Sequence, residues 1–221
     1  CRELRSLSRA EPAPTGGCRR KRSPMSDQTP SRAQLRRTLR AQRRAVSAGT
    51  RRRATRGFAR HLPGALGARR FRHFGVYQAG DGELDPLPAL AHSRFGEAAL
   101  YLPVLDRVHR GRLHFHLWRR ERRLKANRFG IGEPRRRERA RAAWALDAIL
   151  VPLVGFDDRG HRLGMGGGFY DRALADLARR PRRPRLIGVA FEFQRQPRLR
   201  EAAWDQPLDQ VVTDVRRYLV S

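Results

Sequence analysis

The segment 149–172 carries the residues of this chain that could bind a phosphorylated ligand. Its second half reads R-L-G-M-G-G-G-F-Y-D, with glycines at 164, 166, 167 and 168. Glycine can adopt positive φ and lets the backbone approach a ligand closely, and successive N–H groups in such a turn, followed by a helix, form a phosphate cradle. Arg162 could clamp a phosphate oxygen, and Asp171, in the first turn of the helix, could bind Mg²⁺. The segment therefore predicts a phosphate-binding turn.

Two common phosphate-binding motifs do not account for this turn. A Walker A loop needs Lys followed by Ser or Thr after its last glycine, and Phe169 and Tyr170 stand there instead. The dinucleotide fingerprint G-x-G-x-x-G matches only loosely, with its third glycine displaced to Gly167 or Gly168. It also usually opens the first βαβ unit, not one three-quarters along the chain. A tight connection without a ligand is the remaining alternative, but four glycines between an arginine and an aspartate favour a ligand.

The turn lies between the strongest strand pattern in the sequence, the apolar run at 148–154, and a helix predicted over 169–179. Further strands are predicted at 71–77, 98–102, 113–118, 185–191 and 209–213. Further helices are predicted at 31–62, with a break near 47–50, at 87–95 and, less regularly, at 135–143. This alternation indicates an α/β fold: a Rossmann-like single domain of three α/β/α layers around a mostly parallel sheet.

Arginine dominates the composition. Of the 49 basic residues only Lys21 and Lys125 are lysine, and the 221-residue chain has a formal net charge of +28. So one-sided a ratio indicates a GC-rich coding bias first. The charge itself predicts weak, salt-sensitive binding of polyanions. No zinc-finger spacing, RNA-recognition signature or aromatic-interleaved basic stripe accompanies it, so the sequence gives no sign of specific recognition. We therefore expect no specific nucleic-acid partner.

The first 30 residues are expected to be a disordered or artefactual extension ahead of a domain at 31–221. They lack the apolar core of a signal peptide, and Met25 suggests a later translation start. Both cysteines, Cys1 and Cys18, lie in this stretch, so the domain has no disulfide or cysteine–metal framework. The sequence contains no apolar run of about 18 residues that could span a membrane. We expect a monomer in the cytoplasm.

The run at 150–172 resembles the signature of the 5-formyltetrahydrofolate cyclo-ligases (methenyltetrahydrofolate synthetases). The resemblance extends to Y-L-P-V at 101–104, F-G-I-G-E-P at 129–134 and L-R-x-x-L-R at 35–40, and it covers residues 31–214. It implies that ATP phosphorylates the formyl oxygen of 5-formyltetrahydrofolate. Attack by N10 and loss of phosphate then give 5,10-methenyltetrahydrofolate, ADP and phosphate. Much of such a reaction is positioning and charge neutralisation around the γ-phosphoryl group.

Residue by residue, the resemblance implies adjoining sites for ATP and folate. The ATP residues are Arg32, Arg36, Arg162, Leu163, Gly164, Met165, Gly166, Gly167, Gly168, Phe169 and Tyr170. The folate residues are Gln78, Glu83, Met165, Gly166, Gly167, Gly168 and Phe169. Glu83 would accept hydrogen bonds from pterin N–H groups. The catalytic residues are Arg162, Tyr170 and Asp171. The magnesium ligands are Asp171 and Asp205, with Asp209 as the alternative to Asp205.

Arg32 departs from the pattern of the family, which has a nucleotide-contacting lysine at this position. Arginine keeps the charge but replaces a point ammonium with a planar fork, which changes the contact geometry. Two other functions stay open: the first is motivated by the net charge and by Arg32, and the second by the fold alone. One is a basic nucleic-acid-binding protein that retains the fold without catalysis. The other is a sugar-phosphate or acyl-transfer enzyme on the same type of sheet, because a fold does not fix a function.

Several other residues of suggestive type receive ordinary structural explanations. Asp157 and Asp158 precede Gly160 and fit an Asx turn without a metal. Three histidines lack an obvious further metal ligand, so surface or core positions are favoured: His109, His114 and His116. Three tryptophans are expected to pack in the core or at its rim, although an aromatic ring could stack on a pterin: Trp118, Trp144 and Trp204.

Overall fold

The computed structural model describes residues 30–91, 93, 95–106, 112–135 and 137–220, and within them an eight-stranded mixed sheet forms the centre of the molecule. In sheet order the strands are β12 (Arg217–Leu219), β11 (Gln210–Val212), β10 (Arg185–Val189), β7 (Ala148–Pro152), β1 (His73–Gly75), β2 (Ala99–Leu105), β3 (Leu113–Leu117) and β6 (Ala140–Arg141). The five strands from β11 to β2 run parallel, and β12, β3 and β6 are antiparallel at the edges. The mostly parallel α/β sheet is therefore confirmed.

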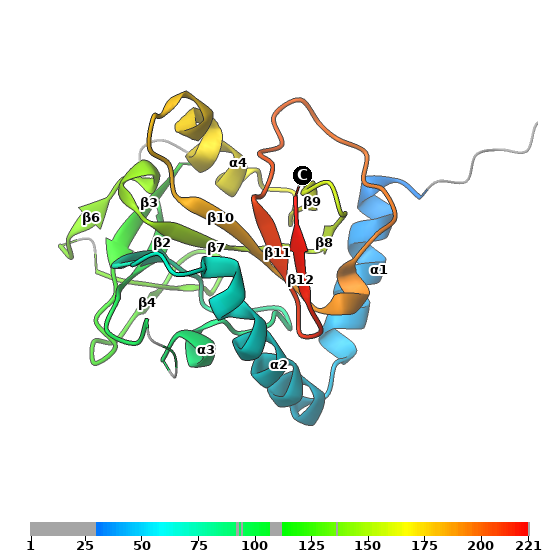
Figure 1. Ribbon diagram of the computed structural model, residues 1–221, viewed down its shortest axis with the longest axis horizontal. Helices are drawn as coiled ribbons and strands as arrows, with labels where there is room; N and C mark the ends of the chain where they lie inside the picture. The colour runs from blue at the N-terminus through cyan, green and yellow to red at the C-terminus, as the bar shows by residue number, and fades with distance from the viewer. Residues whose placement is uncertain (1–29, 92, 94, 107–111, 136, 221) are drawn as a thin grey trace, which may run out of the picture.

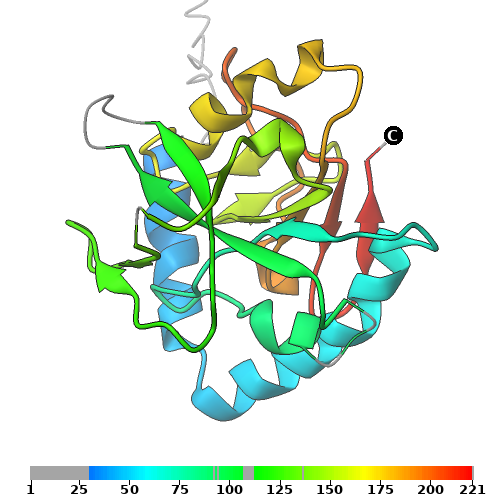
Figure 2. The same ribbon diagram turned by 90° about the vertical axis from the view of Figure 1, so that its left-hand side faces the viewer.

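Helices cover both faces of the sheet, as Figures 1 and 2 show. One face carries α2 (Ala48–Leu66) and α3 (Leu87–Ala91), and the other carries α4 (Phe169–Leu174), which continues as a 3-10 helix over Ala175–Arg179. In the side view of Figure 2 the sheet lies between α4 above and α2 below. The remaining short 3-10 helices are Ala143–Ala145 and Glu192–Gln194. These layers confirm the three-layer prediction.

Strand β7 is buried on both faces, which explains its uninterrupted apolar sequence. Leu150 packs in the cluster beneath α2, while Ile149 and Val151 pack in the cluster beneath α4, and all three are 0% exposed. Fully burying one such side chain stabilises the fold by about 1.5–3 kcal/mol. The strand therefore anchors the start of the glycine-rich connection in the middle of the core.

Helix α1 (Arg32–Ala45) stands at the carboxyl ends of the central strands, beside the hairpin of β8 (Gly155–Phe156) and β9 (Arg162–Leu163) (Figure 1). A capping box starts the helix: Gln34 N donates to Ser31 Oγ at 3.2 Å, and Ser31 N donates to Gln34 Oε1 at 2.8 Å. Ser47 caps α2 with its side chain alone, since its Oγ accepts from Thr50 N at 3.2 Å. The predicted break in the 31–62 helix is thus confirmed, although α2 continues to Leu66.

The strand order places two loops next to each other. Strand β2 pairs with one side of β1. Strand β7 pairs with the other side, and β10 pairs with β7 beyond it, so the order of strands reverses at β1. The crevice at such a reversal is where open α/β sheets bind ligands, outside the carboxyl ends of the strands. Here the segment after β1 carries Gln78 and Glu83, and the segment after β7 leads to the glycine-rich turn.

Several details of the sequence prediction differ from the structure. The helix predicted at 135–143 is wrong: the described part of this stretch contains β6 and the start of a 3-10 helix, because residues 140–141 pair with β3. The loop at 125–134 contains a hairpin of β4 (Lys125–Ala126) and β5 (Gly132–Glu133). Helix α3 ends at Ala91, and β12 was not predicted.

The expectations for the N-terminal stretch concern residues 1–29, which lie outside the described residues. No helix in the described part of the chain is long and apolar enough to cross a membrane.

Candidate active site

Helix α1 points a row of arginines at the loops that follow β1 and β7. Their spacing of four, four and three residues puts them on one helix face: Arg32, Arg36, Arg40 and Arg43. Arg36 Nε donates to Gly164 O at 2.8 Å, and Arg43 Nη1 donates to Leu153 O at 3.1 Å. The row therefore ties α1 to both ends of the β7–α4 connection. Arg40 and Arg43 were not predicted, although their spacing from Arg36 is a readable signal.

The glycine-rich turn has the backbone conformation that its composition predicts. Gly166 has φ +99° and Gly168 has φ +62°, both in the region that favours glycine. The Arg36 guanidinium carbon lies 3.5 Å from the point where a Cβ on Gly166 would stand. On the other side, Arg172 Nη2 donates to Gly167 O at 2.6 Å. Two arginines thus flank a turn that is open to solvent at Gly166 and Gly167.

Arg162 is a buried cation at the base of the turn. It is 4% exposed, and its guanidinium donates to the Asp171 carboxylate and to the backbone oxygen of Gln206. Burial lowers the pKa of Arg162, while the charges of Asp171 and Asp205 oppose that shift. The group remains protonated at neutral pH. The structure thus brings both predicted magnesium carboxylates to one arginine.

Arg32 pairs with the second of these carboxylates. Its Nη1 lies 2.7 Å from Asp205 Oδ2 and its Nη2 lies 3.4 Å from Oδ1, while Nη1 also donates to Arg200 O. The planar fork of arginine makes this two-point contact possible, whereas a lysine ammonium binds as a point charge. Asp209, the alternative metal ligand, is at the other edge of the sheet. It accepts from Arg183 and from Leu186 N, at the amino end of β10.

The loop after β1 is held by a cluster of charges around Asp81. Burial alone would raise the pKa of the Asp81 carboxyl, but hydrogen bonds from Arg40, Arg44 and Arg43 hold it well below its ordinary value. Asp81 also has φ +48°, a strained conformation for a residue with a side chain. The arginines hold this conformation and so fix the position of the adjacent Glu83.

Glu83 is a half-buried carboxylate facing the interior of the site. Its Oε2 accepts from Gly80 N at 3.1 Å, and its Oε1 lies 3.5 Å from Arg43 Nη1. Burial raises the pKa of Glu83 above its ordinary value, against the opposing charge of Arg43. Gln78 lies against β5, since its Oε1 is 2.5 Å from the point where a Cβ on Gly132 would stand. Both predicted folate residues thus lie in the segment after β1, where Gln78 reaches β5 and Glu83 reaches α1.

Two buried tyrosine hydroxyls lie near Glu83. The Tyr77 hydroxyl donates to Leu84 O at 2.6 Å. The Tyr170 hydroxyl is buried and has no hydrogen-bond partner. Burial and the charge of Glu83 raise the pKa of Tyr170, so its hydroxyl is a neutral donor at pH 7. A buried hydroxyl without a partner costs about 1–3 kcal/mol, which makes this a position where a polar ligand group would be stabilised.

An apolar wall lies beside the turn, and Phe129 is its one residue that was not predicted as part of the site. The rings of Phe129 and Phe169 meet edge to face at 5.9 Å between centroids. Phe129 is 54% exposed, and Met165 is 48% exposed. Asn127 fixes the hairpin tip, because its Oδ1 accepts from Phe129 N and from Ile131 N. The segment F-G-I-G-E-P therefore contributes a side of the site, with Phe129 as its contact residue.

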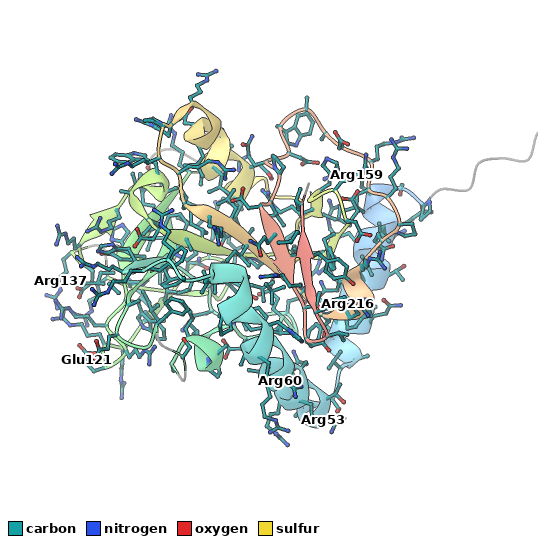
Figure 3. All side chains as sticks on the ribbon, in the orientation of Figure 1. Arg53, Arg60, Glu121, Arg137, Arg159 and Arg216 are labelled. Carbon is teal, nitrogen blue, oxygen red and sulfur yellow. The ribbon has the colours of Figure 1, made fainter. Side chains whose placement is uncertain are left out.

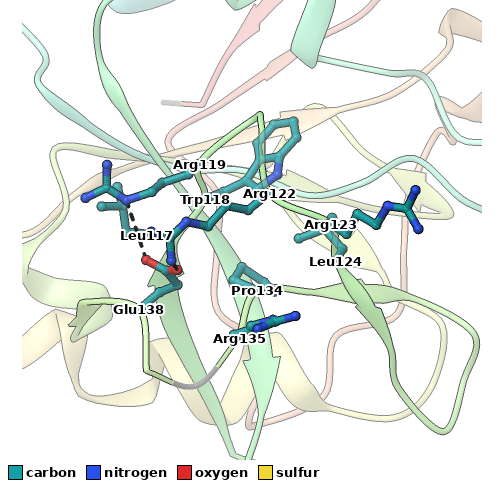
Figure 4. Close-up of a pocket in the computed structure, with 9 residues that line it drawn as sticks. All are labelled: Leu117, Trp118, Arg119, Arg122, Arg123, Leu124, Pro134, Arg135 and Glu138. Carbon is teal, nitrogen blue, oxygen red and sulfur yellow. Dashed lines mark hydrogen bonds and ion pairs between the residues drawn. The ribbon is translucent and has the colours of Figure 1, made fainter.

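A cavity of about 370 Å³ opens beside the turn, a size typical of small-molecule sites. It is lined by Gly166, Gly167, Gly168, Asp171, Arg172, Ala175, Trp204 and Gln206. A second concavity, between β3 and the 134–138 segment, holds only about 10 Å³ (Figure 4). There Glu138 pairs with Arg119 and Arg122. It is too small for a nucleotide or a pterin.

The structure also places most of the residues that received ordinary structural explanations. Asp157 makes the predicted Asx turn, with Arg159 N donating to its Oδ1 at 3.1 Å. His114 contacts Asp106 and His116 contacts Glu138 O, and no group of three metal-ligating side chains occurs in the described part of the chain. His109 lies outside the described residues. Trp118 packs against the core, but Trp144 and Trp204 are 49% and 69% exposed.

Five exposed arginines lie on different elements of the molecule. Figure 3 labels Arg53 and Arg60 on α2, Arg137 after β5, Arg159 in the β8–β9 turn and Arg216 before β12, and these lie on separate parts of the molecule.

The fold and the site together define an α/β domain with an arginine-flanked glycine turn at the sheet reversal. A sequence profile of the 5-formyltetrahydrofolate cyclo-ligase family matches residues 28–214. The chain belongs to this family, whose reaction converts 5-formyltetrahydrofolate to 5,10-methenyltetrahydrofolate with ATP.

Individual relatives agree with this membership. The 5-formyltetrahydrofolate cyclo-ligase of Escherichia coli K12 is 39% identical over 139 residues, which cover 62% of this chain and 75% of that protein. The cyclo-ligase of Haemophilus influenzae is 32% identical over 181 residues, covering 81% and 96%. The 5,10-methenyltetrahydrofolate synthetase of Aquifex aeolicus has a structure similar at a TM-score of 0.71, with 29% identity over 86% of this chain and 92% of that one.

Proposed function

We propose that this chain carries out the family reaction at the crevice between α1 and the glycine-rich turn. ATP would phosphorylate the formyl oxygen of 5-formyltetrahydrofolate, and attack by N10 with loss of phosphate would give 5,10-methenyltetrahydrofolate, ADP and phosphate. The observation that carries the proposal is the meeting of three elements. The arginine-flanked turn, the carboxylates of Asp171 and Asp205, and the half-buried Glu83 near the Tyr170 hydroxyl come together at the sheet reversal.

We assign the ATP phosphates to the turn at 162–170, together with Arg32 and Arg36. Gly166 is open to solvent and has positive φ, which leaves room for a phosphate against the backbone. Helix α4 has only six residues, so its dipole adds little. The charge of the phosphates is therefore balanced mainly by the flanking guanidinium groups, which can bind phosphate oxygens in a bidentate manner.

Magnesium fits Asp171 and Asp205. Mg²⁺ is usually bound by one or two carboxylates together with substrate phosphates, rather than by a complete protein cage. These two carboxylates both lie close enough to Arg162 to affect its pKa. A bound Mg²⁺ would neutralise charge on the phosphoryl group during transfer. The arginines paired with these carboxylates would then be available to the phosphate oxygens.

The folate is assigned to the opposite side of the turn, between the loop after β1 and the apolar wall. Met165 lies on this side, with its Sδ 3.8 Å from Arg43 Nη2. Glu83 offers an acceptor for pterin N–H groups, and the Tyr170 hydroxyl offers a donor to the formyl or pterin oxygen. Gln78 and Phe169 complete the pocket. Phosphorylation would be favoured because Tyr170 and Arg162 are held in place before the ligand arrives.

The test is a spectrophotometric assay with pure protein. Mixing 5-formyltetrahydrofolate with Mg-ATP should yield a chromophore absorbing in the near ultraviolet, together with stoichiometric phosphate. Omitting ATP, or replacing it with a non-hydrolysable analogue, is the control and should abolish the signal. Absence of product with folded protein would refute the proposal. A cytoplasmic location and a monomeric state remain predictions.

A further inference from the structure

Trp204 is a large aromatic side chain left exposed at the mouth of the cavity beside the glycine-rich turn. Its 69% exposure is high for an indole, which normally buries most of its surface. It lines the same cavity as Gly166–Gly168, Asp171 and Arg172. An exposed aromatic face on the rim of a ligand-sized cavity indicates a contact that is completed by a ligand.

The backbone around Trp204 is fixed, although its side chain is exposed. The preceding residues form a turn in which Asp205 N donates to Ala202 O at 2.9 Å and Ala202 N donates to Asp205 Oδ2 at 3.0 Å. The following two residues are held by arginines: Asp205 by Arg32 and the Gln206 oxygen by Arg162. The indole is therefore positioned by the same arginines that we assign to the ATP phosphates.

The position of the cavity relative to the turn indicates whether it would hold a nucleotide base or a pterin. The proposed folate residues contact the turn through Met165, which reaches Arg43 and so the Glu83 loop. Trp204 instead faces the wall built by Asp171, Arg172 and Ala175. A nucleotide whose phosphates lie on the turn would extend its base along this wall. We propose that Trp204 stacks on the base of the bound nucleotide and that Gln206 lies at the edge of the same subsite.

This inference rests on the proposed function, but it can fail independently. Stacking uses the π-face that every base has, so it supplies affinity without selecting one base. We therefore expect Trp204→Ala to weaken binding of a non-hydrolysable ATP analogue about tenfold, and the corresponding GTP analogue by a similar factor. Inorganic triphosphate, which has no base, should bind both proteins equally.

The experiment measures these affinities by calorimetry in the presence of Mg²⁺, together with KM values from the absorbance assay. Trp144→Ala is the matched control, because Trp144 is also exposed but packs under Arg180 away from the cavity. It should leave affinities and KM values unchanged, while Trp204→Phe should retain part of the stacking. For Trp204→Ala we expect KM for ATP to rise about tenfold and KM for folate to stay within twofold.

Three results would overturn the inference. The first is unchanged ATP-analogue affinity in Trp204→Ala. The second is an equal loss of triphosphate affinity, which would mean that Trp204 acts only by positioning the phosphate-binding arginines. The third is a rise in KM for folate instead of ATP. None of these affects turnover by the wild-type protein, so the proposed function is tested separately by its own assay. Unfolding curves of each variant confirm that the comparison is between folded proteins.

Discussion

Arg43 and Arg44 are neighbours in α1 that contact the same carboxylate, Asp81, but differ in burial. The side chain of Arg43 is 1% exposed and that of Arg44 is 57% exposed. Arg43 also donates to the backbone oxygens of Asp81 and Leu153. The pair therefore isolates what burial adds to an ion pair at the edge of the site. We predict that Arg43→Met is much more damaging than Arg44→Met.

The expected magnitudes follow from the two environments. Removing one partner of a buried ion pair costs about 3–5 kcal/mol, and removing an exposed partner costs about 0.2–1 kcal/mol. Arg43→Met should fall near the lower end, because Asp81 keeps Arg40 and the Leu153 oxygen keeps a hydrogen bond from Gln194. In a domain of this size each kcal/mol shifts Tm by roughly 2–4 °C. We expect a Tm loss of roughly 6–12 °C for Arg43→Met and at most about 4 °C for Arg44→Met.

Thermal unfolding followed by circular dichroism measures the two shifts, and the absorbance assay measures KM for 5-formyltetrahydrofolate. Because Arg43 positions the loop that carries Glu83, its replacement should also raise this KM, while Arg44→Met should not. Equal Tm losses in the two variants would refute the reasoning. So would a large Tm loss in Arg43→Met with an unchanged KM, since the loop would then not need this arginine for its position.

Three further outcomes are expected. Asp171→Asn should lower kcat by roughly 100-fold or more at temperatures below its Tm, and turnover near the wild-type rate would remove Asp171 from the site. Asp205→Asn should raise the magnesium concentration needed for half-maximal turnover, and chelation should stop turnover reversibly; an unchanged magnesium titration would exclude Asp205 as a ligand. Burial raises the pKa of Glu83, so KM for folate should rise as pH falls through that raised value, where the carboxyl becomes protonated and loses its acceptor. For the same reason Glu83 should make the fold less stable as pH rises from its ordinary pKa through the raised one, and Glu83→Gln should remove both pH dependences.

The sequence by itself determined the features that are local in the chain. The apolar run of β7, the glycine turn and α4 follow one another without a break, so strand, turn and helix could be predicted with their order and direction. The Asx turn at Asp157 and the capped start of α2 at Ser47 are local hydrogen bonds within four residues. Glycine at positions 166 and 168 predicts positive φ there, since other residues rarely adopt it. Residue composition and the spacing of apolar residues are sufficient to predict an element when the groups that bond within it are close in the chain.

The sequence prediction failed where distant partners decide the outcome. The stretch 135–143 is rich in arginine, a good helix former, but residues 140–141 pair with β3 instead. Propensity is a weak preference, and pairing with an existing sheet overrides it. The missed strand β12 and the hairpin of β4 and β5 are likewise short elements with no pattern of their own. Their structure comes from the strands and loops beside them.

Only the tertiary structure decided how the charges of the site are paired. Asp205 was the predicted second magnesium ligand and Asp209 its alternative, four residues further on; the fold brings Asp205 to Arg32, 173 positions away, and leaves Asp209 at the opposite edge of the sheet. Arg43 became a buried cation because α1 covers the ends of β1 and β7, and Trp204 stays exposed because the turn that carries it is tied down on either side. Charged groups are stable in such positions only when a specific partner compensates their lost hydration. The sequence supplies the glycine turn and its charged residues, and the fold determines which partner each charge meets.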